Sequence, residues 1–271
     1  MRITGFLVVC ITGIFLLYGT FDFPNWGDPF SPASTHLSNY YIEKSFEDTL
    51  VPNLVTSVLA DYRGFDTMFE TAVIFCAGLA CFLLLRNFRK RRNHYYRHIP
   101  TGVTLHLKNY KKLKTGEEFE YVDKEWVPAD LIIKSVCRIL IPFIQIYALY
   151  VVAHGDFSPG GGFQGGVILG SSFILLAISY NLKTLVKRIK EKVFGIFAVI
   201  GVLIYVGIGV LCMIMGGNFL DYSKLESLIY SHHIRALGML GVEIGVGIAV
   251  TAVMVIIYIN IVSEGSYDEG L

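Results

Sequence analysis

The chain has 271 residues, of which 54% are hydrophobic and only 17% are charged. A soluble domain carries roughly 25% charged residues, so most of the surface of this chain must face something other than water. The formal net charge of +1 supports neither a nucleic-acid partner nor a strongly acidic one.

Six apolar blocks are long enough to cross a lipid bilayer, which takes about 20 predominantly apolar residues. The first block competes with a signal peptide, but only Arg2 precedes it and no small-residue cleavage site follows Tyr18, so we expect a retained helix. The sequence therefore predicts an all-α, polytopic membrane protein with about six transmembrane helices. In chain order the predicted spans are 3–21, 66–85, 131–153, 163–180, 193–215 and 236–262.

One substantial polar segment divides the chain between the second and third spans. It opens with the strongly basic run RNFRKRRNHYYRH and continues into the acidic run EEFEYVDKE. We therefore predict a two-helix module over 1–85, a basic cytoplasmic linker over 86–130 and a four-helix module over 131–271. We find no internal repeat, which counts against a stand-alone transporter, because many transporter folds are built from repeats.

The lysines and arginines predict how the chain is oriented in the membrane. Eighteen of the 23 lie before the first span, in the segment 86–134 or in the linker 183–192, whereas four lie in the alternate loops. Cytoplasmic loops carry the excess of basic residues. Both termini and the basic segments are therefore predicted to be cytoplasmic.

Ionisable residues around the start of the second span form the first candidate site. Charged groups at membrane depth are costly unless they are paired or hydrated. Asp66 and Glu70 share one helix face at i, i+4 spacing, and Arg63 is near enough in sequence to pair with either. This pattern fits a site for a hard cation such as sodium, a proton relay, or simply a capped and salt-bridged helix entry. Asp61 and Thr67 complete the ion-path candidates of this cluster.

The motif HGDFSPGGGFQGG, residues 154–166, lies between the third and fourth spans. Irregular backbone at membrane depth survives only where protein or water covers it, and a histidine titrates near neutrality. We therefore treat His154 and Asp156 as ion-path candidates; the alternative is a tight extracellular hairpin with a solvated His–Asp pair. The residues assigned to the turn and to close helix packing are Pro159, Gly160, Gly161, Gly162, Gly165 and Gly166.

A single carboxylate, Glu243, lies about one third of the way into the last span, within a GxxxG-type packing face that includes Gly245. It either hydrogen-bonds a neighbouring helix or belongs to an ion path, and we favour the ion path. The five cysteines contain no CxxC pair, so we interpret them as buried apolar residues. No firm metal site is predicted; the residues that fit a transient sodium ion are Asp66 and Glu70.

Two parts of the chain resemble a known family of multisubunit membrane proteins. VVAHGDFSPGGGFQGGVILGSSFILLAISY, residues 151–180, resembles the signature of the B subunit of Mrp-type Na+/H+ antiporters, and GVEIGVGIAVTAVMVIIY resembles that subunit's last span. This MnhB-like resemblance covers residues 128–262. VTSVLADYRGFDTMFETAVIF, residues 55–75, resembles the end of the large A subunit. In membrane-bound hydrogenases the two parts are the separate E and F subunits, whereas here they are fused.

The resemblance implies a membrane subunit, not an enzyme by itself, that helps to form a sodium translocation path. It places Asp66 and Glu70 near that path and the His–Gly turn in the same region; relatives often have a different residue where Asp156 stands. Because the large antiporter-like portion is absent, an energy-converting hydrogenase-like complex is favoured over a free-standing Mrp antiporter. A purely structural membrane scaffold is the third hypothesis.

The resemblance also implies the surroundings of the chain. The expected partners are other membrane subunits, the lipid bilayer, Na+ and H+, with no nucleic acid. No cofactor is expected in this chain, whereas iron–sulfur clusters or a nickel–iron centre are expected in partner subunits of a hydrogenase-like complex. The expected location is the cytoplasmic (inner) membrane of a prokaryote.

Overall fold

The computed structural model describes residues 2–87, 93–101, 103–108, 118–121, 131–227 and 234–263. Each predicted span coincides, to within two residues at either end, with a helical segment long and apolar enough to cross a membrane. An α-helix satisfies its backbone hydrogen bonds internally, which the hydrocarbon core demands. The prediction of a polytopic helical protein is confirmed. The six segments are Ile3–Asp22, Gly64–Leu85, Leu131–Ala153, Gly162–Tyr180, Glu191–Ile214 and Ile234–Val262.

Residues 1–45 form a compact unit that we describe by itself. Its long helix α1 is apolar on all sides, and none of its spanning window is buried within the described part of the chain. Such a surface suits lipid or the apolar surface of another membrane protein. The helical elements that begin in this unit are α1 (Arg2–Gly19), the 3₁₀ turn η1 (Thr20–Asp22), the π-helical turn η2 (Ala33–Leu37) and α2 (Ser38–Thr49).

The second predicted span is preceded by a broken helix. Four residues of α-helix, α3 (Leu54–Ser57), run into the π-helical turn η3 (Val58–Tyr62), and α4 (Gly64–Asn87) follows. Arg63 interrupts the helical path with φ −120° and ψ 33°, and its backbone N–H donates to the carbonyl of Val58 at 2.7 Å, five residues back. Such π-helical insertions are often found at functional sites.

The linker contains a small antiparallel sheet of order β2-β1-β3 that the sequence analysis did not predict. On the central strand, Tyr96 pairs with Leu105 on one side and Tyr121 on the other, and its side chain is buried. Tyrosines favour strands, but the dense basic residues of this segment hide the alternation. The strands are β1 (Asn93–His98), β2 (Thr104–Lys108) and β3 (Phe119–Tyr121).

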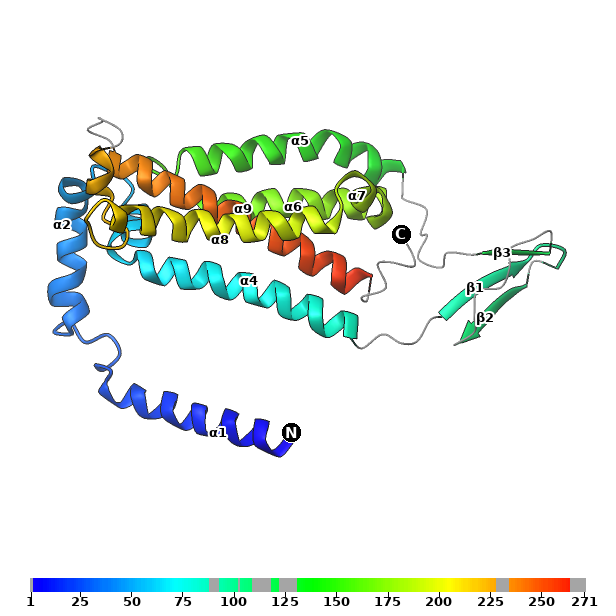
Figure 1. Cartoon of the computed structure of the whole chain (residues 1–271), viewed down its shortest axis with the longest axis horizontal. Helices are drawn as coiled ribbons and strands as arrows, with labels where there is room; N and C mark the ends of the chain where they lie inside the picture. The colour runs from blue at the N-terminus through cyan, green and yellow to red at the C-terminus, as the bar shows by residue number, and fades with distance from the viewer. Residues whose placement is uncertain are drawn as a thin grey trace. The chain divides into compact units, whose positions relative to one another are not determined.

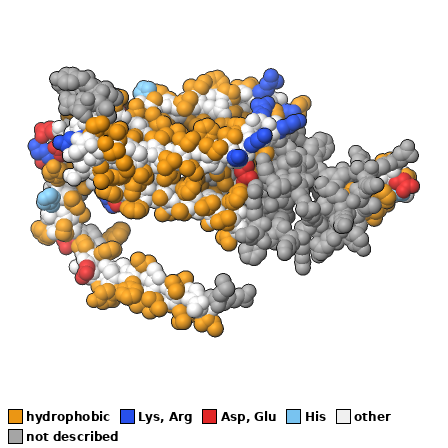
Figure 2. All heavy atoms as spheres, in the orientation of Figure 1, with side chains coloured by type: hydrophobic (Ala, Val, Ile, Leu, Met, Phe, Trp, Pro, Cys, Tyr) orange, Lys and Arg blue, Asp and Glu red, His pale blue; other side chains and the backbone are white. Residues whose placement is uncertain are grey.

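The remaining spans pack around α9 (Ile234–Val262), which contacts α4, α5, α6 and α8 (Figure 1). Two-thirds of its spanning window is buried. Hydrophobic side chains cover the sides of this bundle, while lysines and arginines gather at the end near α7 (Figure 2). The other elements are α5 (Leu131–Ala153), α6 (Gly162–Tyr180), α7 (Leu182–Arg188), α8 (Glu191–Ile214) and the 3₁₀ helix η4 (Tyr222–Ser227).

Glycines bring α9 unusually close to its neighbours. A Cβ added at Gly201 of α8 would lie 2.5 Å from the carbonyl oxygen of Gly245, and one added at Gly166 of α6 would lie 2.7 Å from that of Gly247. Thr251 then donates its hydroxyl to the Gly166 carbonyl at 2.9 Å. Inside a membrane the hydrophobic effect does not drive apolar helices together, because lipid tails are equally apolar. Close backbone packing is therefore a principal source of helix association there.

We expect Gly201→Ala to destabilise the bundle, because the added methyl group would press α8 away from α9. Overpacking of this kind costs about 1–3 kcal/mol. The matched control is Gly207→Ala on the same helix, where a Cβ meets nothing within 4 Å; it should keep or slightly raise stability. Thermal unfolding of both variants in detergent checks the difference, and equal melting temperatures would contradict the close-packing account.

Candidate functional site

Glu243 is a buried carboxylate in the interior of the bundle. It lies on α9, and only 9% of its surface is exposed. One carboxylate oxygen, Oε1, accepts a hydrogen bond from the Thr56 hydroxyl at 3.3 Å. The other oxygen, Oε2, is buried and has no hydrogen-bond partner among the described residues. An unsatisfied carboxylate oxygen away from water is costly, so this position needs a proton or a cation as its partner.

The glycine turn, which we define as residues 154–161, closes over this carboxylate. A Cβ at Gly155 would lie 2.4 Å from Oε2 of Glu243, and a Cβ at Gly161 would lie 2.8 Å from Oε1. Gly162, the first residue of α6, is held so close that its Cβ would overlap the backbone carbonyl of Glu243, at 1.9 Å. Glycines are therefore required here because the carboxylate of Glu243, or at Gly162 its backbone, occupies the space that a side chain would need.

Two residues of the glycine turn have a backbone that L side chains rarely adopt. Gly160 and Gly161 have φ angles of +144° and +147°, a region that is open essentially to glycine alone. The turn can therefore reverse the chain within a few residues and direct α6 back along α9. Pro159 precedes these two glycines and is exposed.

Asn53 ties the broken helix to the glycine turn. Its side-chain oxygen accepts from the N–H of Val55 and caps α3. Its amide nitrogen donates to the carbonyls of Gly155 and Ser158 at 2.7 and 2.8 Å. The single hydroxyl proton of Thr56 is shared between the Gly155 carbonyl, at 2.8 Å, and Oε1 of Glu243. The residues that face Glu243 are thus positioned by two segments about 100 residues apart in the sequence.

Asp156 places a second carboxylate at this site. Its backbone carbonyl accepts from the N–H of Asn53 at 3.0 Å, and its side-chain Oδ1 is buried without a hydrogen-bond partner among the described residues. Burial raises the pKa of Asp156 above its ordinary value. Asp156 and Glu243 are near enough to repel each other electrostatically, so a shared proton or a bound cation would relieve both.

Asp61 and Arg235 form a separate ion pair at the start of α9. The guanidinium donates through Nε and Nη2 to the two carboxylate oxygens, at 2.5 and 3.1 Å, and through Nη1 to the carbonyl of Asp48 at 2.7 Å. Tyr222 adds a hydrogen bond to the carbonyl of Ala60 at 2.8 Å. Each charge of the pair is neutralised by the other, so the ion pair joins η3 to α9.

The other predicted residues of the first cluster lie outside the Glu243 pocket. Arg63 pairs with Asp66, and both side chains are at least half exposed. Thr67 donates its hydroxyl to the carbonyl of Leu59 at 2.8 Å and so bridges the break in the helix. Glu70 is exposed on α4. The structure therefore separates Asp66 and Glu70, which face outward, from the enclosed pair Asp156 and Glu243.

His154 is exposed, and its ring stacks on the ring of Tyr150 with 4.1 Å between the two ring centroids. It is thus placed at the surface of the glycine turn, whereas Asp156 of the same motif is partly buried.

Two other predicted glycines serve helix contacts. A Cβ at Gly165 would lie 2.3 Å from Val152 of α5, and one at Gly245 would lie 2.9 Å from the carbonyl of Gly201.

Three residues of the arrangement were not singled out from the sequence: Asn53, Thr56 and Arg235. Asn53 follows a proline and precedes an apolar run, which is an N-cap signal. Thr56 gave no signal, because a lone threonine in a short apolar segment is common. Arg235 was counted only as a basic residue of an outer loop, and its pairing with Asp61, 174 residues earlier, cannot be read from spacing.

Two family models match separate parts of the chain. The family model described as a domain related to the MnhB subunit of Na+/H+ antiporters matches residues 132–256, which include the glycine turn and Glu243. The model for the E subunit of MBH (MbhE) matches residues 29–98. One part of the chain is thus similar to MnhB and another part to MbhE. The predicted resemblance is confirmed.

Two of the three curated relatives described here have antiporter names. The A/B subunit of a probable K(+)/H(+) antiporter of Rhizobium meliloti is 27% identical over 200 residues, which are 72% of this chain and 18% of that protein. The uncharacterized protein MJ1307 of Methanocaldococcus jannaschii is 26% identical over 63% of this chain and 60% of its own length. The B subunit of a Na(+)/H(+) antiporter of Bacillus subtilis is 35% identical over 35% of this chain and 65% of its own length. The chain thus spans less than two thirds of the length of each of these relatives.

Two solved structures share the fold. A chain of the membrane-bound sulfane sulfur reductase, an archaeal respiratory membrane complex, matches with a TM-score of 0.59 and 24% identity, over 96% of this chain and 97% of that chain. A chain of the Mrp complex from Dietzia sp. DQ12-45-1b matches with a TM-score of 0.60 and 24% identity, over 94% of this chain but only 25% of that chain.

We expect Asn53→Asp to weaken the contact between the broken helix and the glycine turn. Aspartate keeps the acceptor that caps α3 but removes the amide donor to the carbonyls of Gly155 and Ser158. The Gly155 carbonyl keeps its hydrogen bond from Thr56, but the Ser158 carbonyl loses the Asn53 donor, and leaving such a carbonyl unsatisfied costs about 1–3 kcal/mol. Thermal unfolding in detergent measures the loss, with Asn25→Asp, an exposed asparagine in the first unit, as the control. Equal losses in both variants would contradict the bridging role.

The raised pKa of Asp156 predicts a pH dependence of stability. The folded state holds this proton more tightly than the unfolded state, so the stabilisation is present below the ordinary aspartate pKa and is lost as the pH rises through the folded value. Asp156→Asn removes that loss. The melting temperature of Asp156→Asn should therefore rise relative to that of the wild type as the pH increases above the ordinary aspartate pKa of about 4. Parallel curves over this range would contradict the assignment.

Proposed function

We propose that this chain is a non-catalytic membrane subunit of a Mrp-type cation/proton antiporter module and that the pocket around Glu243 forms part of its ion path. The observation that carries the proposal is the Oε2 atom of Glu243, buried inside an MnhB-related domain without a partner among the described residues. Ionisable groups inside a membrane are rare and are typical of ion and proton pathways.

The chemistry of the pocket supports a proton or a hard monovalent cation as the transported species. The Glu243 and Asp156 carboxylates, the Thr56 hydroxyl and the carbonyl of Gly155 all offer oxygen atoms. Oxygen ligands are those that hard cations prefer. A cation and a proton would satisfy the same carboxylate oxygens, so they would compete for the site, and such competition is what couples an exchange of the two.

The exposed carboxylates Asp66 and Glu70 fit the same proposal at a different place. A charged side chain on a membrane-spanning helix is costly against lipid, so another protein of the membrane complex is the partner we propose for this face of α4. The path would then run through Glu243 inside the chain and past Glu70 at its surface.

We further propose that the complex is a redox-driven one, related to membrane-bound hydrogenases. The MbhE region supports this, as does the match over nearly the whole length of a respiratory-complex chain, compared with a quarter of a Mrp-complex chain. Iron–sulfur or nickel–iron centres would belong to partner subunits. The second candidate is a free-standing Mrp antiporter, which the antiporter names of the relatives favour.

The orientation belongs to the same proposal. With both termini on the cytoplasmic side of a prokaryotic inner membrane, the basic residues of α7 and the start of α8 face the cytoplasm, in accord with the excess of basic residues in cytoplasmic loops. The glycine turn then lies toward the outer half of the membrane.

Replacing Glu243 by Gln tests the proposal, because the amide keeps the shape of the side chain but cannot give up a proton or hold a cation by charge. In vesicles containing the whole complex, we expect Glu243→Gln to assemble normally and to lose sodium-dependent proton transport. Glu70→Gln should weaken it as well. Glu43→Gln, an exposed carboxylate of α2, is the control and should transport like the wild type.

The scaffold hypothesis predicts the opposite pattern. If the chain only held its neighbours together, Gly165→Leu would disrupt assembly, while Glu243→Gln and Glu70→Gln would transport normally. Normal transport by both neutral variants would therefore overturn the ion-path proposal.

A further inference from the structure

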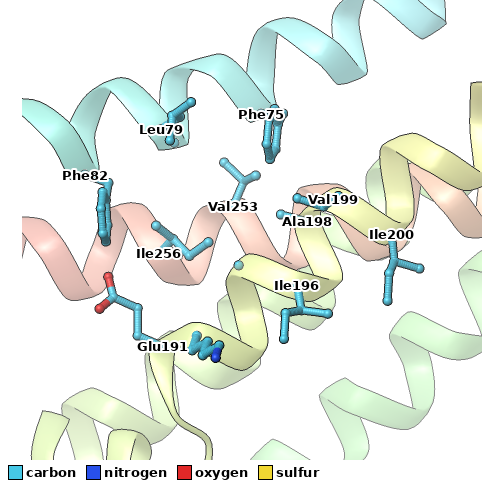
Figure 3. A pocket seen from close by; sticks show the side chains of 13 residues that line it. Phe75, Leu79, Phe82, Glu191, Ile196, Ala198, Val199, Ile200, Val253 and Ile256 are labelled. Atoms are coloured by element: carbon cyan, nitrogen blue, oxygen red, sulfur yellow. The ribbon is translucent and has the colours of Figure 1, made fainter.

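An apolar groove runs between α4, α8 and α9, away from the Glu243 pocket. Its volume is about 560 Å³. Figure 3 shows Phe75 and Phe82 of α4 pointing toward Val253 and Ile256 of α9, and residues of α8 complete the lining. The groove reaches from Glu191 to Ile200 along α8, which corresponds to about 13.5 Å at the rise of an α-helix.

Small residues make the room for this groove. Gly195 and Ala198 on α8 and Gly78 on α4 all line it. A Cβ at Gly78 would lie 2.8 Å from Val253 of α9, so α4 and α9 touch at the bottom. At Gly195, in contrast, a Cβ would meet nothing within 4 Å. The chain's own side chains therefore leave the space beside Gly195 unfilled.

The lining is polar at one end only. Glu191 and Lys192 lie there, and all other lining residues are apolar or glycine. Glu191 is buried and accepts a hydrogen bond from the amide of Asn260 at 2.8 Å. Lys192 is exposed, and Lys187 and Arg188 are exposed nearby on α7, so basic side chains surround this end (Figure 2). A groove that is apolar along its length and basic at one mouth matches an amphiphile with an anionic head.

We propose that this groove binds one hydrocarbon chain of a phospholipid whose phosphate lies against Lys192. A lysine at the end of a span extends its charged group toward the polar interface, and basic pockets between membrane helices bind anionic lipid head groups. Residues 187–192 include four basic side chains and one acidic side chain. This net positive charge at the mouth of the groove attracts a phosphate.

The charge at the mouth favours a lipid over an apolar helix of a partner subunit. A phospholipid offers a phosphate to Lys192 as well as a hydrocarbon chain to the apolar lining. A single hydrocarbon chain is thinner than a helix and can follow an uneven floor between side chains.

The first test fills the groove. The complex is extracted and washed in detergent, and the phospholipid that it retains is measured by native mass spectrometry. We expect the wild type to retain a phospholipid and Gly195→Phe to lose it, because the ring occupies the chain's place. Gly207→Phe is the matched control, since a Cβ there also meets nothing within 4 Å but lies outside the groove; it should retain the lipid. Equal retention in all three, or none in the wild type, would overturn the proposal.

The second test identifies the occupant even if Gly195→Phe fails to assemble. A photoreactive phenylalanine analogue in place of Ile196, which lines the groove, should give an adduct with the mass of a phospholipid. An adduct with the mass of another protein of the complex would show a protein helix there and overturn the proposal. Lys192→Gln should lower lipid retention, and Lys224→Gln, an exposed lysine of η4 that does not line the groove, should not; unchanged retention in Lys192→Gln would overturn the assignment of the phosphate.

Discussion

The enclosure of the Glu243 carboxylate is the constraint on which most of this structure depends. One oxygen is held by Thr56 and the other is left without a partner among the described residues. Two backbone features accompany this close approach of the protein to that group: the glycines at 155, 161 and 162, and the positive φ angles of the turn. A side chain at any of these glycines would occupy the place of the carboxylate or of its backbone.

Three kinds of charged group can be distinguished by their surroundings. The exposed pair Arg63 and Asp66 resembles surface ion pairs, which typically contribute about 0–1 kcal/mol, so it does little to explain why its segment folds as it does. The ion pair between Asp61 and Arg235 is more enclosed, and the loss of either partner would leave a half-buried charge. Glu243 differs from both because no basic side chain is paired with it among the described residues. A carboxylate without such a partner is available for a proton or a cation.

The sequence was sufficient for features that depend on local pattern. The six spans followed from hydrophobic length, and Glu243 was noticed because a carboxylate in an apolar block is rare. The glycine motif was noticed because three consecutive glycines cannot belong to a regular span. Features that depend on distant pairing could not be derived in this way. Arg63 was an obvious candidate to pair with the acids of its cluster, yet Asp61 is paired with Arg235.

Sequence spacing also could not show which acidic residues lie together in one site. Spacing placed Asp66 and Glu70 on one helix face, but it could not show that this face is outward. Nor could spacing show that Thr56 reaches Glu243 across 187 residues of sequence. The small sheet in the linker was missed for a related reason: strand pairing between Tyr96 and Tyr121 joins segments whose composition, basic and then acidic, indicates only exposure.

The most direct test of the central claim is to observe the Glu243 carboxylate itself while the transported ion is exchanged. Infrared difference spectra of the complex in membranes, recorded with and without sodium, report the carbonyl stretch of a protonated carboxylic acid. We predict a sodium-dependent change in this band in the wild type and its loss in Glu243→Gln, with the band retained in the Glu43→Gln control. Identical difference spectra for the wild type and Glu243→Gln would contradict the account.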